Sequence, residues 1–126
     1  MHILLIEPDA VAAPLYAAGL RAADHTVATA ASAQAAIGAA DRKQPDVVIM
    51  EMQLGTHNGI AFLQEFRSYA EWQSVPVIVH SFQKPPTDTA VLDVLQREYG
   101  MRSWLYKPQT SIAALASAVH RLGIPA

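Results

Sequence analysis

Cysteine is absent from the 126 residues, which excludes disulfide bonds and thiolate chemistry and fits a reducing compartment. No basic cluster is present and the net charge is -2, which argues against a nucleic-acid-binding surface. The opening segment MHILLIEPDA lacks a basic leader, and its apolar run is too short for a signal peptide. No apolar stretch approaches the length of a membrane span. We therefore expect a cytoplasmic protein that contacts neither membranes nor nucleic acid.

The composition favours a folded chain, because 52% of the residues are hydrophobic and only 16% are charged. A length of 126 residues is enough to bury a real core and is most simply one domain, residues 1–126.

The most informative stretch is residues 45–59, PDVVIMEMQLGTHNG. Residues 47–50 and Met52 form an apolar run broken only by Glu51, and such a run is typical of a strand buried on both faces of a parallel sheet. A carboxylate at the end of a buried strand is costly unless it has a purpose there. Glu51 is therefore the first candidate for a site residue.

Alternating strand and helix patterns continue along the whole chain. We expect strands at 2–6, 25–28, 47–51, 75–81 and 103–106, and helices at 10–23, 33–43, 59–69, 88–99 and 111–122. Short connections and right-handed crossovers then predict an α/β fold, a flavodoxin-like, doubly wound five-stranded parallel sheet in the order 2-1-3-4-5 with helices on both faces.

Several residues mark where the helices begin and end. Asp9 and Ser32 are expected caps of the first two helices, Thr87 or Asp88 of the fourth, and Thr110 or Ser111 of the fifth. Gly100 is expected to end the fourth helix. Pro14 either kinks the first helix or marks a later start. Val11, Leu15 and Leu20 are expected on one side of that helix.

Four polar residues follow the strands that end at one edge of this sheet. They come from distant parts of the sequence, yet the topology predicts that they line one pocket. They are Glu7, Glu51, Ser81 and Lys107.

With these residues in place, the chain resembles the receiver domain of bacterial two-component response regulators over essentially its whole length. The family has an acidic pair after the first strand, a phosphoacceptor Asp after the third, Thr or Ser after the fourth and Lys-Pro after the fifth. The matching positions here are Glu7-Pro8, Glu51, Ser81 and Lys107-Pro108. In the family the Lys-Pro peptide is cis. Trp104 stands where the family has an aromatic switch residue.

Two departures from the family pattern affect its chemistry. The phosphoacceptor position holds Glu51, whose carboxylate lies one methylene further out, and Pro8 replaces the second metal-binding acid. Since magnesium usually takes one or two carboxylates, losing one ligand predicts weak or absent Mg²⁺ binding and no other cofactor. Glu7 and Asp9 are weak candidates for residual cation binding, although helix capping and solvation are the simpler roles.

We therefore predict a pseudo-receiver in phosphorelay signalling, not an enzyme, in which Glu51 pairs with Lys107, accepts a hydrogen bond from Ser81 and is not phosphorylated in the usual way. The resemblance implies protein partners such as a histidine kinase or an output protein. It also implies a possible homodimer through the fourth helix, fifth strand and fifth helix. Trp104, Tyr99 and Tyr106 are candidates for the switch and partner surface.

Two other functions stay open at this point. One is a Mg²⁺-dependent receiver that is phosphorylated, and the other is a flavodoxin-like enzyme that binds a flavin or nucleotide. The second requires a Gly- or Ser/Thr-rich phosphate loop after the first strand, whereas that loop is the acidic Glu7-Pro8-Asp9. His80 is expected to be a core histidine, and His57 a loop residue.

Overall fold

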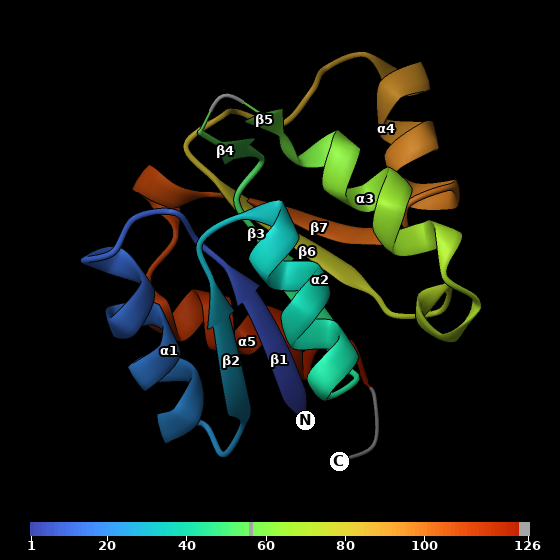
Figure 1. Cartoon of the computed structure of the whole chain (residues 1–126). Coiled ribbons are helices and arrows are strands. Elements are labelled where there is room, and N and C mark those ends of the chain that lie inside the picture. Colours follow the sequence, from blue (N-terminus) through green and yellow to red (C-terminus); the bar gives the residue numbers. More distant parts are fainter. Residues whose placement is uncertain (56, 124–126) are drawn as a thin grey trace.

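The computed structural model describes residues 1–55 and 57–123 and has a parallel five-stranded sheet at its centre (Figure 1). The strand order is β2-β1-β3-β6-β7, which confirms the predicted order because β6 and β7 are the fourth and fifth strands of this sheet. The strands are β1 (His2–Ile6), β2 (Thr26–Ala30), β3 (Val47–Met50), β6 (Val77–Ser81) and β7 (Met101–Tyr106).

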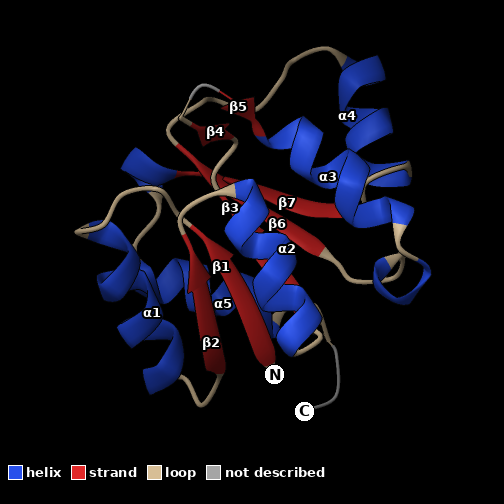
Figure 2. Cartoon of the chain, in the orientation of Figure 1, coloured by secondary structure: helices blue, strands red, loops and turns tan. Residues whose placement is uncertain are grey.

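Helices cover both faces of the sheet, as Figure 2 shows. One core layer holds residues from α1 and α5, and the other holds residues from α2, α3 and α4. The helices are α1 (Ala12–Ala22), α2 (Ala33–Arg42), α3 (Gly59–Ser68), α4 (Thr89–Arg97) and α5 (Ile112–His120), with short 3-10 helices η1 (Ala70–Trp72) and η2 (Lys107–Gln109). Among the described residues, no helix is both long and apolar enough to cross a bilayer.

The central strand β3 is buried on both faces, as its unbroken apolar run predicts. Val47 and Ile49 pack into the layer of α1 and α5, while Val48 and Met50 pack into the opposite layer. This alternation follows from the two-residue period of a strand.

Hydrogen-bond pairing corrects the predicted strand ends. The second strand is Thr26–Ala30 because it pairs along the full length of β1, from His2 to Ile6. The fourth begins at Val77 and the fifth at Met101, which are paired with each other before a register shift. The third strand ends at Met50, so Glu51 follows it directly.

The start and inner face of α1 also differ from the prediction. The helix begins at Ala12, so Pro14 lies in its first turn, where a missing N–H costs little. Its buried residues are Ala13, Ala17 and Leu20. The expectation for Val11 and Leu15 is wrong, because both are exposed, at 78% and 58%. A spacing of five residues puts Leu15 well around the helix from Leu20.

Side-chain caps form at the predicted starts of α2, α4 and α5, whereas the N-cap of α1 is Val11, which has no side-chain cap hydrogen bond. Asp9 accepts hydrogen bonds from the N–H groups of Val11 and Ala12 at 2.8 and 3.1 Å. Ser32 caps α2, and of the alternatives, Asp88 caps α4 and Ser111 caps α5. An unexpected element follows Glu51, the two-stranded antiparallel pair β4 (Gln53–Leu54) and β5 (His57–Asn58).

A partly buried guanidinium ties α3 to the segment before β7. Arg67 donates hydrogen bonds to the carbonyl groups of Trp72, Val75 and Tyr99. Gly100 lies against this guanidinium with a φ of +70°, and a Cβ atom there would collide with Arg67 Nη2. Gly55 has a similar φ of +68°, but its missing Cβ faces open space.

We expect Gly100→Ala to destabilise the protein more than Gly55→Ala. Both variants place alanine in a left-handed conformation, at a cost of about 1–2 kcal/mol. Only Gly100→Ala also displaces Arg67, whose hydrogen bonds are each worth about 1.5–3 kcal/mol because the donor is charged. Urea unfolding would measure both variants, and equal losses would contradict the role of the Arg67 contact.

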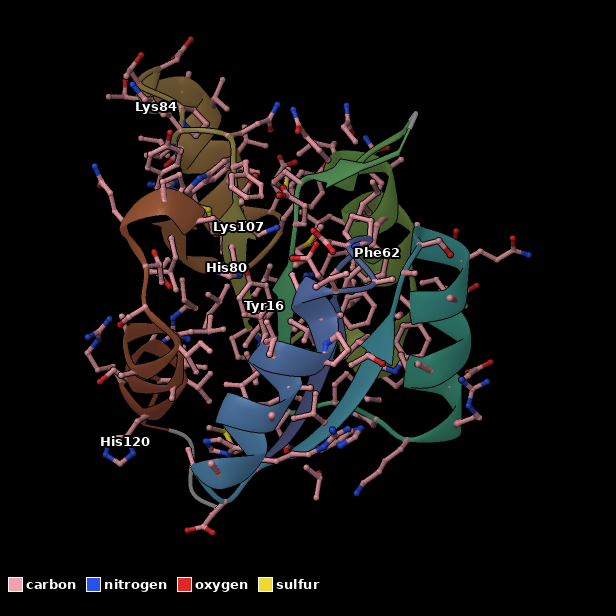
Figure 3. All side chains as sticks on the ribbon, turned by 90° about the vertical axis from the view of Figure 1, so that its left-hand side faces the viewer. Tyr16, Phe62, His80, Lys84, Lys107 and His120 are labelled. Atoms are coloured by element: carbon pink, nitrogen blue, oxygen red, sulfur yellow. The ribbon has the colours of Figure 1, made fainter. Side chains whose placement is uncertain are left out.

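His80 is a core histidine, as predicted, with 2% exposure. Its ring meets Tyr16 of α1 edge-on, with ring centroids 4.8 Å apart, and Figure 3 shows both residues below Lys107. The pKa of His80 is lowered to about 4, mainly by burial and also by the Lys107 charge, while the Glu51 charge opposes the shift. The buried imidazole is therefore neutral at neutral pH.

We expect His80 to make the protein less stable as the pH falls from 6.5 to about 4. The unfolded imidazole binds a proton in this range and the folded one does not, so protonation favours unfolding by up to about 3 kcal/mol. Urea unfolding at several pH values should show a flatter acid limb for His80→Gln. The exposed His120→Gln is the matched control, and identical slopes in both variants would contradict this account.

Candidate functional site

The four polar residues at the strand ends meet in one buried cluster. Glu7 follows β1, Glu51 follows β3, Ser81 is the last residue of β6 and Lys107 follows β7. None of them is more than 8% exposed. They meet because parallel strands place their carboxyl ends at the same edge of a sheet.

The Glu51 carboxylate accepts four hydrogen bonds. Its Oε1 atom accepts from Lys107 Nζ at 3.0 Å and from the backbone N–H of Phe82 at 3.1 Å. Its Oε2 atom accepts from the backbone N–H of Gln53 at 3.0 Å and from the Ser81 hydroxyl. A carboxylate offers about four lone-pair positions, so the hydrogen-bonding capacity of Glu51 is filled.

The Lys107 ammonium bridges two carboxylates. Its Nζ atom lies 2.7 Å from Glu7 Oε1 and 3.0 Å from Glu51 Oε1, so Glu7 is the nearer partner. It also lies 4.8 Å from the centre of the Phe82 ring, within range of a cation–π contact. Glu7 Oε2 accepts the backbone N–H of Asp9 at 3.1 Å.

These contacts keep the pair ionised at neutral pH. Burial raises the pKa of Glu51, but the hydrogen bonds from Ser81, Gln53, Lys107 and Phe82 outweigh it and hold this pKa below its usual value. Burial lowers the pKa of Lys107, but Glu7 and Glu51 outweigh it and hold this pKa above its usual value. The ion pair between Glu51 and Lys107 therefore stabilises the fold at neutral pH. This stabilisation is lost at acidic pH, when Glu51 is protonated, and at alkaline pH, when Lys107 is deprotonated.

The residues of the cluster do not fit the Mg²⁺ ion that the receiver resemblance implies. Pro8 offers no side-chain oxygen, and Asp9 Oδ1 accepts the N–H groups of Val11 and Ala12 before α1. An ammonium group stands between the Glu7 and Glu51 carboxylates, where it would repel a divalent cation. Over residues 1–55 and 57–123, no group of three or more acidic, histidine or cysteine side chains is arranged to hold a metal.

A chain of hydrogen bonds leads from Glu51 to the surface of β7. Ser81 donates to Glu51, and its oxygen accepts the backbone N–H of Gln83 at 3.0 Å. The carbonyl group of Gln83 accepts a hydrogen bond from Trp104 Nε1 at 2.9 Å. The partly exposed indole of Trp104 is therefore anchored to the loop that begins at the buried cluster.

The three aromatic residues expected at a partner surface are all partly exposed. Trp104 and Tyr106 are two residues apart on β7, so they point to the same face of the sheet. Trp104 and Tyr99 both pack against the core layer of α2, α3 and α4. The structure therefore brings these aromatic residues to the side of the sheet where α4 lies.

Some expectations from the sequence need correction. The Lys107–Pro108 peptide is trans, and Lys107 begins the short helix η2. The predicted polar loop residue His57 belongs to β5, and its side chain lies outside what the structure describes. Glu7 lies in the pocket, as the topology predicts, but the simpler roles of helix capping and solvation are wrong for it, because it is buried as the nearer partner of Lys107.

Sequence reasoning missed the contributions of Phe82 and Gln53. Their backbone N–H groups hold Glu51, and no residue type signals such a role because every residue except proline has this donor. The Phe82 ring over Lys107 has one weak signal, an aromatic residue directly after Ser81.

Comparison with solved structures agrees with this fold. Chemotaxis protein CheY4 of Vibrio cholerae matches with a TM-score of 0.82 at 20% identity, covering 95% of this chain and 96% of that chain. A sensor protein from Polaromonas sp. JS666 matches with a TM-score of 0.79 at 20% identity, covering 95% and 93%. At this identity, the two matches show the fold alone.

A third solved structure is the receiver domain of a sensor histidine kinase from Pseudomonas aeruginosa, which has a magnesium ion coordinated in its active-site cleft. It is 26% identical, with a TM-score of 0.78, and the match covers 95% of this chain and 94% of that chain. No curated protein matches the chain significantly.

The family model of the response regulator receiver domain matches residues 3–120, which includes the whole sheet except His2 and all four residues of the buried cluster. The chain therefore belongs to the response regulator receiver domain family of two-component signalling.

Proposed function

We propose that this receiver domain signals through protein–protein interaction without being phosphorylated at Glu51. The observation that carries the proposal is the occupied Glu51 carboxylate, which accepts hydrogen bonds from Ser81, Lys107 and two backbone N–H groups. A hydroxyl and an ammonium group at these positions hold the phosphoryl group in the family. Here, the side chain itself supplies the negative charge that they bind.

Three features support resistance to phosphorylation. An attacking oxygen of Glu51 would have to give up a hydrogen bond, because all four of its lone-pair positions are used. The extra methylene of glutamate displaces the carboxylate, and a misplacement of about 1 Å can cost about a hundredfold in rate. The cluster also lacks the ligands for Mg²⁺, so we propose a module that needs no metal.

The series of hydrogen bonds that connects Glu51 to Trp104 through Ser81 and Gln83 supports a fixed, active-like state. Glu51 holds Ser81, Ser81 holds Gln83, and Gln83 holds the indole. We propose that Trp104, Tyr99 and Tyr106 contact a protein partner, which is a histidine kinase or an output protein. A homodimer through α4, β7 and α5 would use the same surface.

Two alternatives are weaker on these observations. A Mg²⁺-dependent receiver has the magnesium-bound Pseudomonas domain in its favour, but the Lys107 ammonium stands between the two available carboxylates here. An enzyme that binds a flavin or nucleotide phosphate would meet the buried Glu7 carboxylate and Pro8 in the loop after β1. A binding module is therefore preferred to an enzyme. The cytoplasmic location stays a prediction from the sequence.

Incubation with acetyl phosphate and Mg²⁺ should leave the mass of the wild-type protein unchanged. The matched control is the double variant Pro8→Asp/Glu51→Asp, which restores the family's metal-binding acid and its phosphoacceptor. We expect only the double variant to gain a phosphoryl group by intact-mass measurement, or to give a Mg²⁺-dependent NMR response to beryllofluoride. Stoichiometric phosphorylation of wild-type Glu51 would overturn the proposal.

Glu51→Gln should weaken partner binding, because it removes the charge that Ser81 and Lys107 hold. The variant should retain its fold and lose most of the capture of histidine kinases or output proteins, measured by affinity capture with mass spectrometry. The indole N–H signal of Trp104 should shift in NMR spectra, while that of the buried Trp72 should not. Unchanged capture together with an unshifted Trp104 signal would argue against signalling by Glu51.

A further inference from the structure

The position of Lys107 carries an inference about which cation this pocket accepts. Its Nζ atom lies 2.7 Å from Glu7 and 3.0 Å from Glu51, and both carboxylates are at most 4% exposed. Charge-assisted contacts of this length are strong, because the groups are shielded from water. The ammonium group thus occupies the space between the two acids in the way a bound cation would.

The Lys107 ammonium group has three neighbours in this pocket. It contacts the Glu7 and Glu51 carboxylates, and its Nζ atom lies 4.8 Å from the centre of the Phe82 ring. Phe82 itself is 61% exposed. Lys107 is therefore held by two carboxylates and an aromatic ring, and its positive charge disfavours a second cation beside it.

The oxygens of both carboxylates already accept hydrogen bonds or contact Lys107. Each oxygen of Glu51 accepts two hydrogen bonds. Glu7 Oε1 contacts Lys107, and Glu7 Oε2 accepts the backbone N–H of Asp9. A metal ion would have to displace Lys107 or break hydrogen bonds to bind here. Without Lys107, the same place would hold two buried carboxylates and no compensating cation, which is the condition that favours a hard divalent ion.

We propose that Lys107 is the resident cation of this pocket, so that the wild-type protein binds no divalent ion between Glu7 and Glu51. Removing the ammonium group converts these two carboxylates into a site for Mg²⁺ or Mn²⁺. The inference rests on the proposed function, because it explains why that function needs no metal. It also assigns Glu7 the role of a positioning residue that holds Lys107.

The test is a Mn²⁺ titration of the full chain, comparing the wild type with Lys107→Met. In the wild type, the amide NMR signals of Gln53 and Phe82 should not broaden selectively, and the Tm should not depend on Mn²⁺. In Lys107→Met, the same signals should broaden, and the Tm should rise by about 5 °C or more as Mn²⁺ approaches saturation. The double variant Lys107→Met/Glu7→Gln is the matched control and should lose this response.

Each outcome decides the inference. Folding of Lys107→Met only in the presence of Mn²⁺ or Mg²⁺ would support it, because the ion would replace the missing charge. Saturable binding by the wild type, or no binding by Lys107→Met at any metal concentration, would overturn it. These results are independent of partner capture by Glu51→Gln, so this inference and the proposed function can fail separately.

Discussion

The structure depends on how one buried carboxylate, that of Glu51, is kept charged away from water. Such a group is costly to bury unless hydrogen bonds and an opposite charge replace its hydration. Here the replacements come from three strand ends, through Gln53 after β3, Ser81 and Phe82 at the end of β6, and Lys107 after β7. The contacts can form together only if these strand ends stay in register. The charge and the parallel sheet therefore support one another.

The departures from the family pattern form one consistent change. Lengthening the acid at position 51 lets its oxygens reach Ser81 and the backbone donors. Pro8 removes a potential metal ligand, and Glu7 turns to Lys107 instead. The Asp9 carboxylate accepts N–H groups at the start of α1, and the backbone N–H of Asp9 donates to the Glu7 carboxylate. The result is a pocket in which one ammonium group of the chain contacts two carboxylates.

Much of the fold could be predicted because its signals are local and repeated. The apolar run of β3 and the caps Ser32, Asp88 and Ser111 specify elements, and the alternation of elements then specifies a parallel sheet. Convergence of Glu7, Glu51, Ser81 and Lys107 follows from that topology. The error at Val11 and Leu15 arose because small alanines, together with Leu20, face the sheet in α1.

The detailed partners in the cluster could not be predicted from the sequence. Lysine has a long flexible side chain, so its choice between Glu7 and Glu51 depends on rotamers and on distances that differ by tenths of an ångström. Backbone donors such as those of Gln53 and Phe82 have no sequence signature. The strand pair β4 and β5 was missed because it consists of two residues on each side, too few to show a periodic pattern.

Glu51 is a permanent part of the chain, which affects how the proposed signal can be regulated. A phosphoryl group can be added by a kinase and hydrolysed by a phosphatase within the lifetime of a protein molecule. A glutamate is installed by the ribosome and stays until the chain is degraded. On the proposed function, the strength of the signal would follow the number of molecules present, so transcription, translation and proteolysis would set its timing.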